Sequence, residues 1–263
     1  MKALYNNQIV ENHLVIPFND RAVQFGDGLF ETIIVTNNSI PLLPYHLKRL
    51  RQGAKSLKLD FTKSKKIEEM IFNVLQVNGL NKHARVKIQV WRKPNVNPGY
   101  SISTSSSNLM ISAVKFEPKQ NLFKENVSFS EDVSLHFSKY SRFKTTNGLP
   151  YIYASIERDE KGFDDLILMD REGNVSECIS SNVFWVKDKT YYTPSLRSGC
   201  VGGVMRNYII DQLKESGVKI KKVMANKHEL LGADAVFSTN VTGISVIRSI
   251  DSVEFSPVLE LPF

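Results

Sequence analysis

The sequence of 263 residues lacks the features that mark several large classes of protein. It has two cysteines, Cys178 and Cys200, without a CxxC spacing, which argues against a disulfide scaffold and against a zinc site. The five histidines are scattered and show no HxxxH spacing, so we expect no metal site. No GxSxG stretch is present that would place a nucleophilic serine on a strand-to-helix turn.

Long apolar runs are also missing. No stretch is long enough to span a bilayer, and the first ten residues, MKALYNNQIV, lack the apolar region of a signal peptide. With so few cysteines, this predicts a cytoplasmic protein that does not bind a membrane. The net charge of +7 suits nucleic acid or small anionic ligands, but the basic stretches HLKRLRQGAKSLKL and KIKKV lack the interleaved aromatics of a nucleic-acid-binding module. We therefore expect small-molecule partners and no nucleic acid.

Strands and helices alternate along the chain, which predicts a mixed α/β fold. In the first half we expect a strand starting at His13, a polar turn, strands over 30–35, 84–93 and 108–116, and helices over 44–59 and 64–80. In the second half we expect a helix over 149–162, with Asn147 as its N-cap, strands over 165–170, 181–186 and 190–194, a helix after Gly203, and two strands joined by a turn over 234–251. The polar stretch EPKQNLFKEN, residues 117–126, predicts a linker between a small domain over 1–116 and a larger one over 127–263.

The stretch GNVSECISSNVFW, residues 173–185, places Glu177 where a strand should be entering the protein interior. A buried and unpaired carboxylate costs several kcal/mol or takes up a proton. Glu177 therefore lies either exposed at a strand end or next to a cationic group.

Two positively charged residues each allow a structural and a functional interpretation. Arg49, in HLKRL, flanks the apolar stripe of its predicted helix and is either a surface charge or a ligand of an anion. Lys144, in SRFKTTNGLP, is either a solvated charge at a helix boundary or a lysine that attacks a carbonyl, which would require partial burial.

Two polar turns extend this pattern. The stretch SGCVGGVMRNYI places glycines directly before a predicted helix, where free N–H groups can bind a phosphate, although an ordinary glycine turn has the same sequence. The stretch STNVTG, residues 238–243, is either a plain turn or a further source of donors to the same anion.

Taken in order, these motifs resemble those of the class IV aminotransferases, the pyridoxal-phosphate enzymes of fold type IV. The resemblance covers nearly the whole chain and is carried by DRAVQFGDGLFE, HLKRL, Lys144 with Asn147 and Leu149, SECISSNVFWV, TPSLRSGCVGGVMR and STNVTG. It implies a small N-terminal α/β domain, a larger cofactor-binding domain with a barrel-like β core, and a homodimer.

The resemblance also implies roles for individual residues. Lys144 matches the lysine that forms a Schiff base with pyridoxal 5'-phosphate and then moves the proton, and Glu177 matches the acid at the pyridine nitrogen. Arg49 matches the side-chain ligand of the phosphate. The other implied cofactor residues are Val201, Gly203, Val204, Met205 and Asn240. The question raised by Glu177 then has an answer, because a carboxylate beside a pyridinium favours the charged ring.

Spacing around Lys144 favours one branch of this family. Two residues separate Lys144 from Asn147, and Gly148 follows, which is similar to the D-amino-acid aminotransferases and aminodeoxychorismate lyases. Phe30 replaces the tyrosine of the former, and we consider Phe30, Arg92, Val241 and Thr242 as substrate residues. The first expectation is an aminotransferase acting on an α-amino acid and a 2-oxo acid. The alternative is an aminodeoxychorismate lyase that releases pyruvate and 4-aminobenzoate with the same lysine and cofactor.

Overall fold

The computed structural model describes residues 1–11, 14–62, 66–80, 82–95, 99–118, 123–259 and 261–262. The chain forms two compact units: unit 1 consists of Met1–Pro118 and Phe143–Asn147, and unit 2 of Lys119–Arg142 and Gly148–Phe263. The linker expected over 117–126 falls where the chain passes from unit 1 to unit 2, and residues 119–122 lie outside the described residues. The domain limits drawn from the sequence stay a prediction. The predicted limits place Lys144 in the second domain, whereas the segment Phe143–Asn147 belongs to unit 1.

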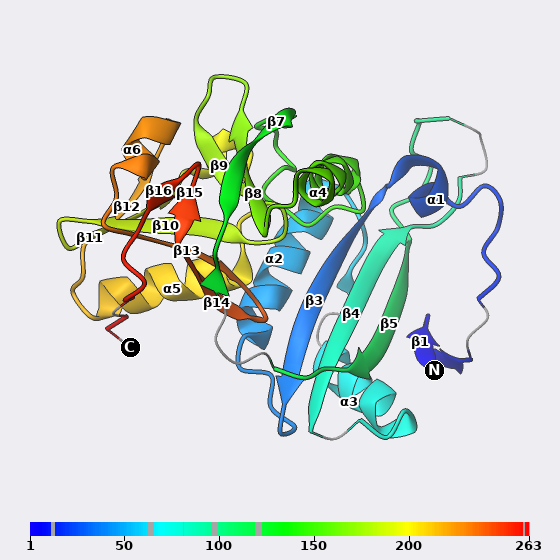
Figure 1. Ribbon diagram of the computed structural model, residues 1–263. Helices are drawn as coiled ribbons and strands as arrows, with labels where there is room; N and C mark the ends of the chain where they lie inside the picture. The colour runs from blue at the N-terminus through cyan, green and yellow to red at the C-terminus, as the bar shows by residue number, and fades with distance from the viewer. Residues whose placement is uncertain are drawn as a thin grey trace. The chain divides into compact units, whose positions relative to one another are not determined.

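Unit 1 is built on a five-stranded sheet in the order β2-β1-β5-β4-β3, in which all neighbours are antiparallel. The strands are β1 (Ala3–Tyr5), β2 (Gln8–Val10), β3 (Gly28–Thr36), β4 (His83–Arg92) and β5 (Ser107–Lys115). The three long strands lie side by side in Figure 1. They confirm the strands expected from the alternating patterns of FETIIV, ARVKIQVWRK and NLMISAVKF.

Two helices, α2 (Leu43–Ser56) and α3 (Ile67–Val77), pack on one face of this sheet. Their apolar sides and the inward residues of β3, β4 and β5 form one core, which includes Leu29, Ile33, Leu50 and Ile71. Successive side chains of a strand point to opposite faces. The residues between those core positions, such as Phe30 and Gln89, therefore lie on the face away from the helices.

The start of the chain departs from the prediction. Residues 14–17 form no strand, so the strand expected to start at His13 is wrong over those residues, and His13 itself lies outside the described residues. A short helix, α1 (Arg21–Phe25), takes the place of the expected turn. Asp20 caps it by accepting hydrogen bonds from the N–H groups of Ala22 and Val23, and this side-chain cap offers the backbone a helical alternative that apolar periodicity does not reveal.

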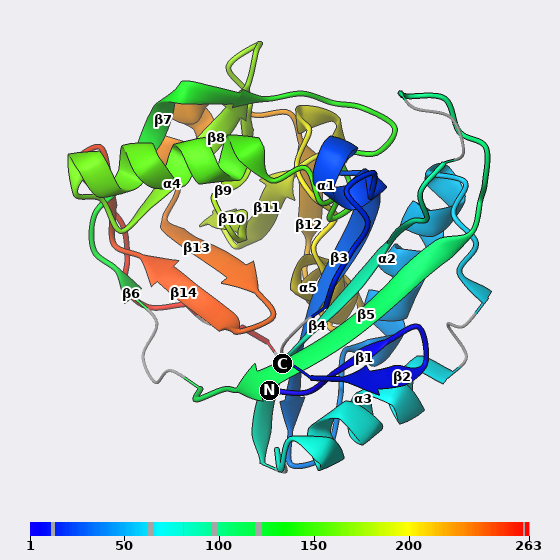
Figure 2. The ribbon, with the colours of Figure 1, turned by 90° about the vertical axis from the view of Figure 1, so that its right-hand side faces the viewer.

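Unit 2 contains two sheets (Figure 2). The first has six strands in the order β12-β11-β10-β13-β14-β6, and the second has five in the order β16-β15-β7-β8-β9. The bounds of the first sheet are β6 (Phe123–Lys124), β10 (Asn182–Lys187), β11 (Thr190–Pro194), β12 (Ile220–Val223), β13 (Ala235–Asn240) and β14 (Gly243–Ile247). The bounds of the second are β7 (Val127–Leu135), β8 (Asp165–Asp170), β9 (Val175–Cys178), β15 (Ser249–Ile250) and β16 (Val253–Glu254).

The two sheets share one hydrophobic core. Val127 and Ile167 of the second sheet pack in the same cluster as Val183, Trp185 and Val236 of the first. Two sheets that share a common core give the barrel-like centre that the family resemblance implied. The expected hairpins are also present: β10 pairs with β11, and β13 pairs with β14, both antiparallel.

The helices of unit 2 are α4 (Leu149–Lys161), α5 (Val204–Glu215) and α6 (Lys227–Leu231), with a 3-10 turn η2 (Leu196–Ser198). The N-cap of α4 is Gly148 and not Asn147, and no side chain among the described residues caps this end. Pro150 in the first turn supplies the preset φ that starts the helix instead. None of the helices in the described ranges has the length and apolar character needed to cross a membrane.

Candidate active site

Glu177 lies inside unit 2, on the short buried strand β9, with only 4 % of its surface exposed. Its carboxylate accepts hydrogen bonds from a hydroxyl, a backbone N–H and a side-chain amide. The Tyr151 hydroxyl donates to Oε1 at 2.8 Å, the backbone N–H of Val201 donates to the same oxygen at 3.1 Å, and the Asn182 side-chain amide donates to Oε2 at 3.0 Å. Glu177 is therefore not exposed at a strand end. Its carboxylate is fixed in orientation from three directions.

Asn182 connects Glu177 to the rest of this region. Its amide nitrogen also donates to the carbonyl of Val201 at 2.8 Å, and its backbone pairs with Thr239, the residue before Asn240. Its Oδ1 lies so close to Gly203 that a Cβ built there would be 1.9 Å away. The residue at 203 must be glycine for Asn182 and the start of α5 to occupy these positions.

The amino-terminal end of α5 begins at Val204, directly after Gly203. No described side chain caps it. The first N–H groups of a helix have no partner within the helix, and together with the helix dipole they favour an anion. Val204 and Met205 supply two of these groups, as the sequence predicted from the glycines before the helix.

The turn between β13 and β14 contains the three other residues that the sequence marked in unit 2. Asn240 is half-buried, and its side-chain oxygen accepts hydrogen bonds from the backbone N–H and the hydroxyl of Thr242, at 2.8 and 2.6 Å. Its amide donates to the carbonyl of Ser180 at 3.2 Å, which ties this turn to the segment between β9 and β10. Val241 is half-buried and Thr242 is exposed.

In unit 1, the segment carrying Lys144 runs along the end of β3. The backbone N–H of Phe30 donates to the carbonyl of Lys144 at 2.8 Å, and Leu29 pairs with Thr145 in a β-bridge. The Lys144 ammonium nitrogen lies 4.9 Å from the centre of the Phe30 ring. Lys144 is half-buried, which is the environment expected of a lysine that reacts with a carbonyl.

Arg49 lies on α2 and is buried, with 7 % exposure. Its Nε donates to Glu31 Oε1 at 2.7 Å, and His46 Nδ1 lies 2.7 Å from Glu31 Oε2. Burial alone would raise the pKa of Glu31, but the charge of Arg49 and the hydrogen bonds from His46 and Arg49 outweigh it and lower that pKa from 4.5 to about 2. The Glu31 carboxylate therefore fixes the direction of the Arg49 guanidinium.

Arg92 does not fit the substrate role expected for it. It is 1 % exposed, and its guanidinium donates to both oxygens of Asp27 and to the carbonyls of Leu57, Lys58 and Thr104. A guanidinium has five N–H donors, and these five acceptors use all of them. Arg92 ties β4 to the loops beside it, because every donor that could reach a substrate carboxylate is already taken.

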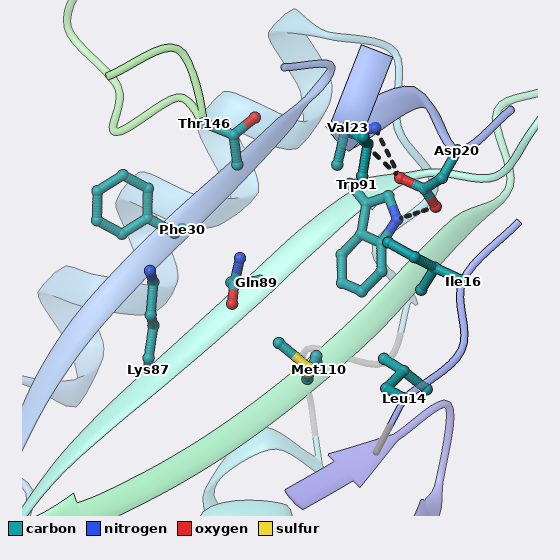
Figure 3. A pocket seen from close by; sticks show the side chains of 11 residues that line it. Leu14, Ile16, Asp20, Val23, Phe30, Lys87, Gln89, Trp91, Met110 and Thr146 are labelled. Atoms are coloured by element: carbon teal, nitrogen blue, oxygen red, sulfur yellow. Dashed lines mark hydrogen bonds between the residues drawn. The ribbon is translucent and has the colours of Figure 1, made fainter. Parts of the chain in front are cut away.

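Unit 1 also contains a pocket of about 330 Å³ on the face of the sheet opposite to α2 and α3 (Figure 3). Phe30, Lys87 and Gln89 line it together with Trp91, and Thr146 reaches it from the segment that follows Lys144. The remaining lining residues are Leu14, Ile16, Asp20, Ala22, Val23 and Met110.

Two contacts in this pocket have defined geometry. The Asp20 carboxylate accepts a hydrogen bond of 2.8 Å from the indole N–H of Trp91, as Figure 3 shows. The ammonium nitrogen of Lys87 lies 5.2 Å from the centre of the Phe30 ring. The pocket thus combines an apolar, aromatic body with an exposed ammonium group on Lys87.

Several of these residues were missed by the sequence analysis. Glu31, Asn182 and Tyr151 hold the predicted Arg49 and Glu177 in place, and Lys87 and Gln89 line the pocket. A polar Asn182 at the start of the apolar run NVFWV was a usable signal. Tyr151 gave none, because its partner is 26 positions away in the chain.

The two cysteines take no part in this arrangement as reactive groups. Both are fully buried and free, and burial raises the pKa of each thiol to about 12. A thiol with such a pKa is not a nucleophile at neutral pH. The described residues contain no group of three or more His, Cys, Asp or Glu side chains that could hold a metal ion.

Comparison with known proteins gives a consistent result. A family model described as amino-transferase class IV matches residues 28–250. The chain is 31% identical over 244 residues to the aminodeoxychorismate lyase of Bacillus subtilis, covering 91% of this chain and 82% of that protein. It is 27% identical over 257 residues to a D-alanine aminotransferase of Bacillus licheniformis, covering 95% and 89%. The crystal structure of 4-amino-4-deoxychorismate lyase from Pseudomonas aeruginosa matches with a TM-score of 0.87 at 25% identity, covering 98% of this chain and 94% of that one.

The chain belongs to the class IV aminotransferase family. Both the family and the fold expected from the motifs are confirmed, and the protein is an enzyme of this family. The family's cofactor is pyridoxal 5'-phosphate, as the motifs predicted.

The residues present fit this cofactor. The Glu177 carboxylate is buried and already oriented, which suits a pyridine nitrogen. The start of α5 offers backbone N–H groups to a phosphate, and Gly203 is the one residue type that its contact with Asn182 permits. Lys144 offers a primary amine of the kind that forms an imine with an aldehyde.

Proposed function

We propose that this enzyme is a pyridoxal-phosphate-dependent aminotransferase that moves an amino group between an α-amino acid and a 2-oxo acid. The observation that carries this proposal is the buried Glu177 carboxylate, held by Tyr151, Asn182 and Val201 in a chain of this family. Such a carboxylate favours the protonated form of a ring nitrogen placed against it.

Each predicted cofactor residue has a defined task in this proposal. When bound, the cofactor supplies the electron sink for the charge left on the substrate after its α-proton is removed. Arg49, oriented by Glu31, would be a side-chain ligand of the phosphate, and the N–H groups of Val204 and Met205 would be backbone ligands. The buried Val201 would contact the ring, and Asn240 would supply a further polar group for the phosphate.

Lys144 would hold the cofactor through its primary amine, and the same amine would take the α-proton of the substrate as a general base. A lysine can do this only as the neutral amine, so its half-buried position beside the Phe30 ring is important. The pocket beside Phe30 receives the substrate, and Val241 and Thr242 stay candidate substrate residues. Arg92 is not included, because all of its donors are used internally.

An aminodeoxychorismate lyase is the second candidate. It is favoured by the 31% identity to the Bacillus subtilis protein of that name. The same Lys144 would remove the proton, but a leaving group would be expelled instead of an amino group being transferred. The products would be pyruvate and 4-aminobenzoate from one substrate, and no second 2-oxo acid would be consumed.

We propose further that the enzyme is a homodimer. Helix α4 exposes Leu149, Ile152, Tyr153 and Ile156, at 62, 57, 59 and 47 % of their surfaces. These residues share one face of the helix, and an exposed apolar stripe of this kind is typical of a protein–protein interface. An Ile152→Asp variant should elute as a smaller species in size-exclusion chromatography, whereas an unchanged elution volume would exclude this stripe as the dimer contact.

A cytoplasmic location is proposed on similar grounds. Cys178 and Cys200 are both buried, free and unbridged. Proteins of reducing compartments keep thiols in this state. Fractionation of cells that express the protein, followed by antibody detection in the cytoplasmic and the exported fractions, tests this assignment.

The proposed function is tested first by reduction with borohydride. The purified protein should be yellow, and borohydride should link the cofactor to Lys144; a label on another lysine would remove Lys144 from its role. A panel of L- and D-amino acids, each with a 2-oxo acid, should then give amino transfer. Pyruvate release from aminodeoxychorismate without any 2-oxo acid would instead establish the lyase.

A further inference from the structure

Tyr151 differs from its neighbours on α4. Ile152 and Tyr153 are largely exposed, whereas the Tyr151 ring packs against the small core cluster formed by Val133, Leu135, Ala154 and Leu168. Its hydroxyl group reaches out of that cluster and donates a hydrogen bond of 2.8 Å to Glu177 Oε1. The helix thus brings one polar atom from its inner side to the carboxylate of the candidate active site.

We propose that Tyr151 is a positioning residue that sets the orientation and the proton affinity of the Glu177 carboxylate, so that the proton shared with the cofactor stays on the ring nitrogen. This inference rests on the proposed role of Glu177 toward the cofactor. It adds a residue from α4 that acts through Glu177 and does not itself touch the cofactor.

The physical argument concerns competition for one proton. A carboxylate that accepts hydrogen bonds is stabilised as the anion and binds a proton less readily. A Glu177 carboxylate held by Tyr151, Asn182 and the Val201 N–H therefore leaves the proton to a ring nitrogen placed against it. Removal of one donor makes the carboxylate more basic and shifts the shared proton toward it.

Tyr151 is suited to be a permanent donor. Burial, together with the charge of Glu177 and the hydrogen bond to it, holds the pKa of Tyr151 far above its ordinary value of 10. The hydroxyl therefore keeps its proton over the whole pH range in which an enzyme works. A histidine at this place would lose or gain a proton near neutral pH and would change its role with it.

Two thiols and a guanidinium that interact with Glu177 also keep their protonation state near neutral pH. Cys178 and Cys200 interact with Glu177 electrostatically, and burial raises the pKa of each to about 12. Arg206, on the first turn of α5, is buried and interacts with Glu177 and Cys200. A guanidinium stays charged at neutral pH even when burial lowers its pKa. A spectral titration of the bound cofactor can therefore detect the loss of the Tyr151 hydroxyl without interference from these neighbours.

Tyr151 is also a cleaner position to test than Asn182. The Asn182 amide serves Glu177 and Val201 at once and lies against Gly203, so a change there disturbs several contacts. The Tyr151 hydroxyl has one hydrogen-bond acceptor within the described part of the chain, Glu177. Tyr151→Phe removes that bond and keeps the ring that packs in the core.

The experiment compares Tyr151→Phe with Tyr192→Phe. Tyr192 lies in the same unit, where its ring stacks on Trp185 with a centroid separation of 5.7 Å, so the control loses a hydroxyl away from Glu177. Apo-protein is titrated with pyridoxal 5'-phosphate, and the visible absorption of the loaded protein is followed against pH. In Tyr151→Phe we expect affinity for the cofactor to fall roughly tenfold, since a hydrogen bond to a charged group is lost.

The same variant should move the spectral transition to higher pH. A ring nitrogen that loses its proton withdraws less charge from the rest of the bound cofactor. The proton whose loss changes the visible absorption is then held more tightly and leaves at a higher pH. We also expect kcat to fall roughly tenfold with KM changed less than about twofold, because the hydroxyl does not contact the substrate. The Tyr192→Phe control should leave all four quantities at their wild-type values.

A double-mutant cycle separates positioning from a merely structural role. If Tyr151 acts through Glu177, Tyr151→Phe has little further effect in a Glu177→Gln background. An equal effect in both backgrounds, or a spectral titration identical to that of the wild type, overturns the inference while leaving the proposed function intact. Failure of the wild-type apo-protein to bind the cofactor through Lys144 would instead overturn the proposed function, and the inference with it.

Discussion

Two of the buried glutamates, Glu31 in unit 1 and Glu177 in unit 2, differ in what surrounds them. Glu31 in unit 1 is 1 % exposed, and its partners are the guanidinium of Arg49 and the imidazole of His46. Glu177 in unit 2 is 4 % exposed, and its carboxylate accepts hydrogen bonds from a hydroxyl, an amide and a backbone N–H. Similar burial therefore accompanies two kinds of hydrogen-bonding environment.

The difference indicates what each carboxylate does. Glu31 forms an ion pair inside its own unit, and its low pKa shows that the pair stabilises the charged form. Its task is to orient Arg49. The hydroxyl, the amide and the backbone N–H that donate to Glu177 orient its carboxylate, which suits the role proposed for it toward a cationic ring. We therefore expect replacement of Glu31 to affect stability and replacement of Glu177 to affect the proposed chemistry.

The largest expected effect is on activity when Glu177 is replaced. Glu177→Gln keeps the size of the side chain and an oxygen for the Tyr151 hydroxyl, but removes the negative charge. We expect kcat to fall by about two to three orders of magnitude, as when one charge-stabilising group is lost from an active site. Steady-state kinetics of the cofactor-loaded enzyme measure this, and urea unfolding should show little change. An unaltered kcat would contradict the role of Glu177.

Glu31→Gln should have the opposite profile, with a large loss of stability. It leaves the buried Arg49 guanidinium without its anionic partner, which typically costs about 3 kcal/mol or more. Urea unfolding of the apo-protein gives the change in free energy. The matched control is Glu11→Gln, an exposed glutamate 3.8 Å from Lys2, which should change stability by less than about 1 kcal/mol. Equal changes in the free energy of unfolding for the two variants would show that burial of the Glu31–Arg49 pair contributes nothing to stability.

Acid pH should reproduce part of this loss in the wild-type protein. The pKa of Glu31 is depressed in the folded state, from 4.5 to about 2, so its stabilising contribution is present above pH 4.5 and is lost as the pH falls toward 2. A shift of this size corresponds to about 3 kcal/mol. As the pH is lowered through this range, the free energy of unfolding should fall more steeply for the wild type than for Glu31→Gln. Parallel curves would show that Glu31 does not titrate in this way.

The smallest expected effect concerns the contact between Gly203 and Asn182. A methyl group at 203 would lie 1.9 Å from Asn182 Oδ1, so Gly203→Ala must displace that amide and with it one donor to Glu177. Overpacking of this kind costs about 1–3 kcal/mol. We expect weaker cofactor retention, measured by equilibrium dialysis, with Gly217→Ala as the control at a glycine whose Cβ would meet nothing within 4 Å. Because Gly217 has a φ of +71°, the control also reports the cost of backbone strain alone.

Much of the fold was predictable from the sequence. The alternating strands β3, β4 and β5, the hairpins of unit 2 and the helices α2 to α5 follow local patterns of apolar residues and turns. The predictions that were wrong concern segments in which more than one local structure fits the sequence. Residues 14–17 have strand-like composition but form no strand, and Pro150 starts α4 after Gly148 without the expected cap from Asn147.

The site was predictable to a smaller extent. The residues proposed to carry the chemistry, Lys144, Glu177 and Arg49, stand in recognisable motifs. Arg92 could not be assigned in the same way, because its acceptors come from Asp27, residues 57–58 and Thr104, and no local pattern shows that these use every donor. The pocket beside Phe30 likewise combines residues from β3, β4, β5 and the segment after Lys144.

The sequence by itself determined the family and most of the long strands and helices, and it supplied the candidates for the reactive groups, because motif spacing and apolar periodicity are properties of neighbouring residues. Only the tertiary structure decided how those groups are held: Arg49 by Glu31, 18 positions away, and Glu177 by Tyr151 and Val201, 26 and 24 positions away. The reason is physical. A hydrogen bond depends on a distance of about 3 Å between two atoms, and the folded backbone alone brings residues so far apart in the chain to that distance.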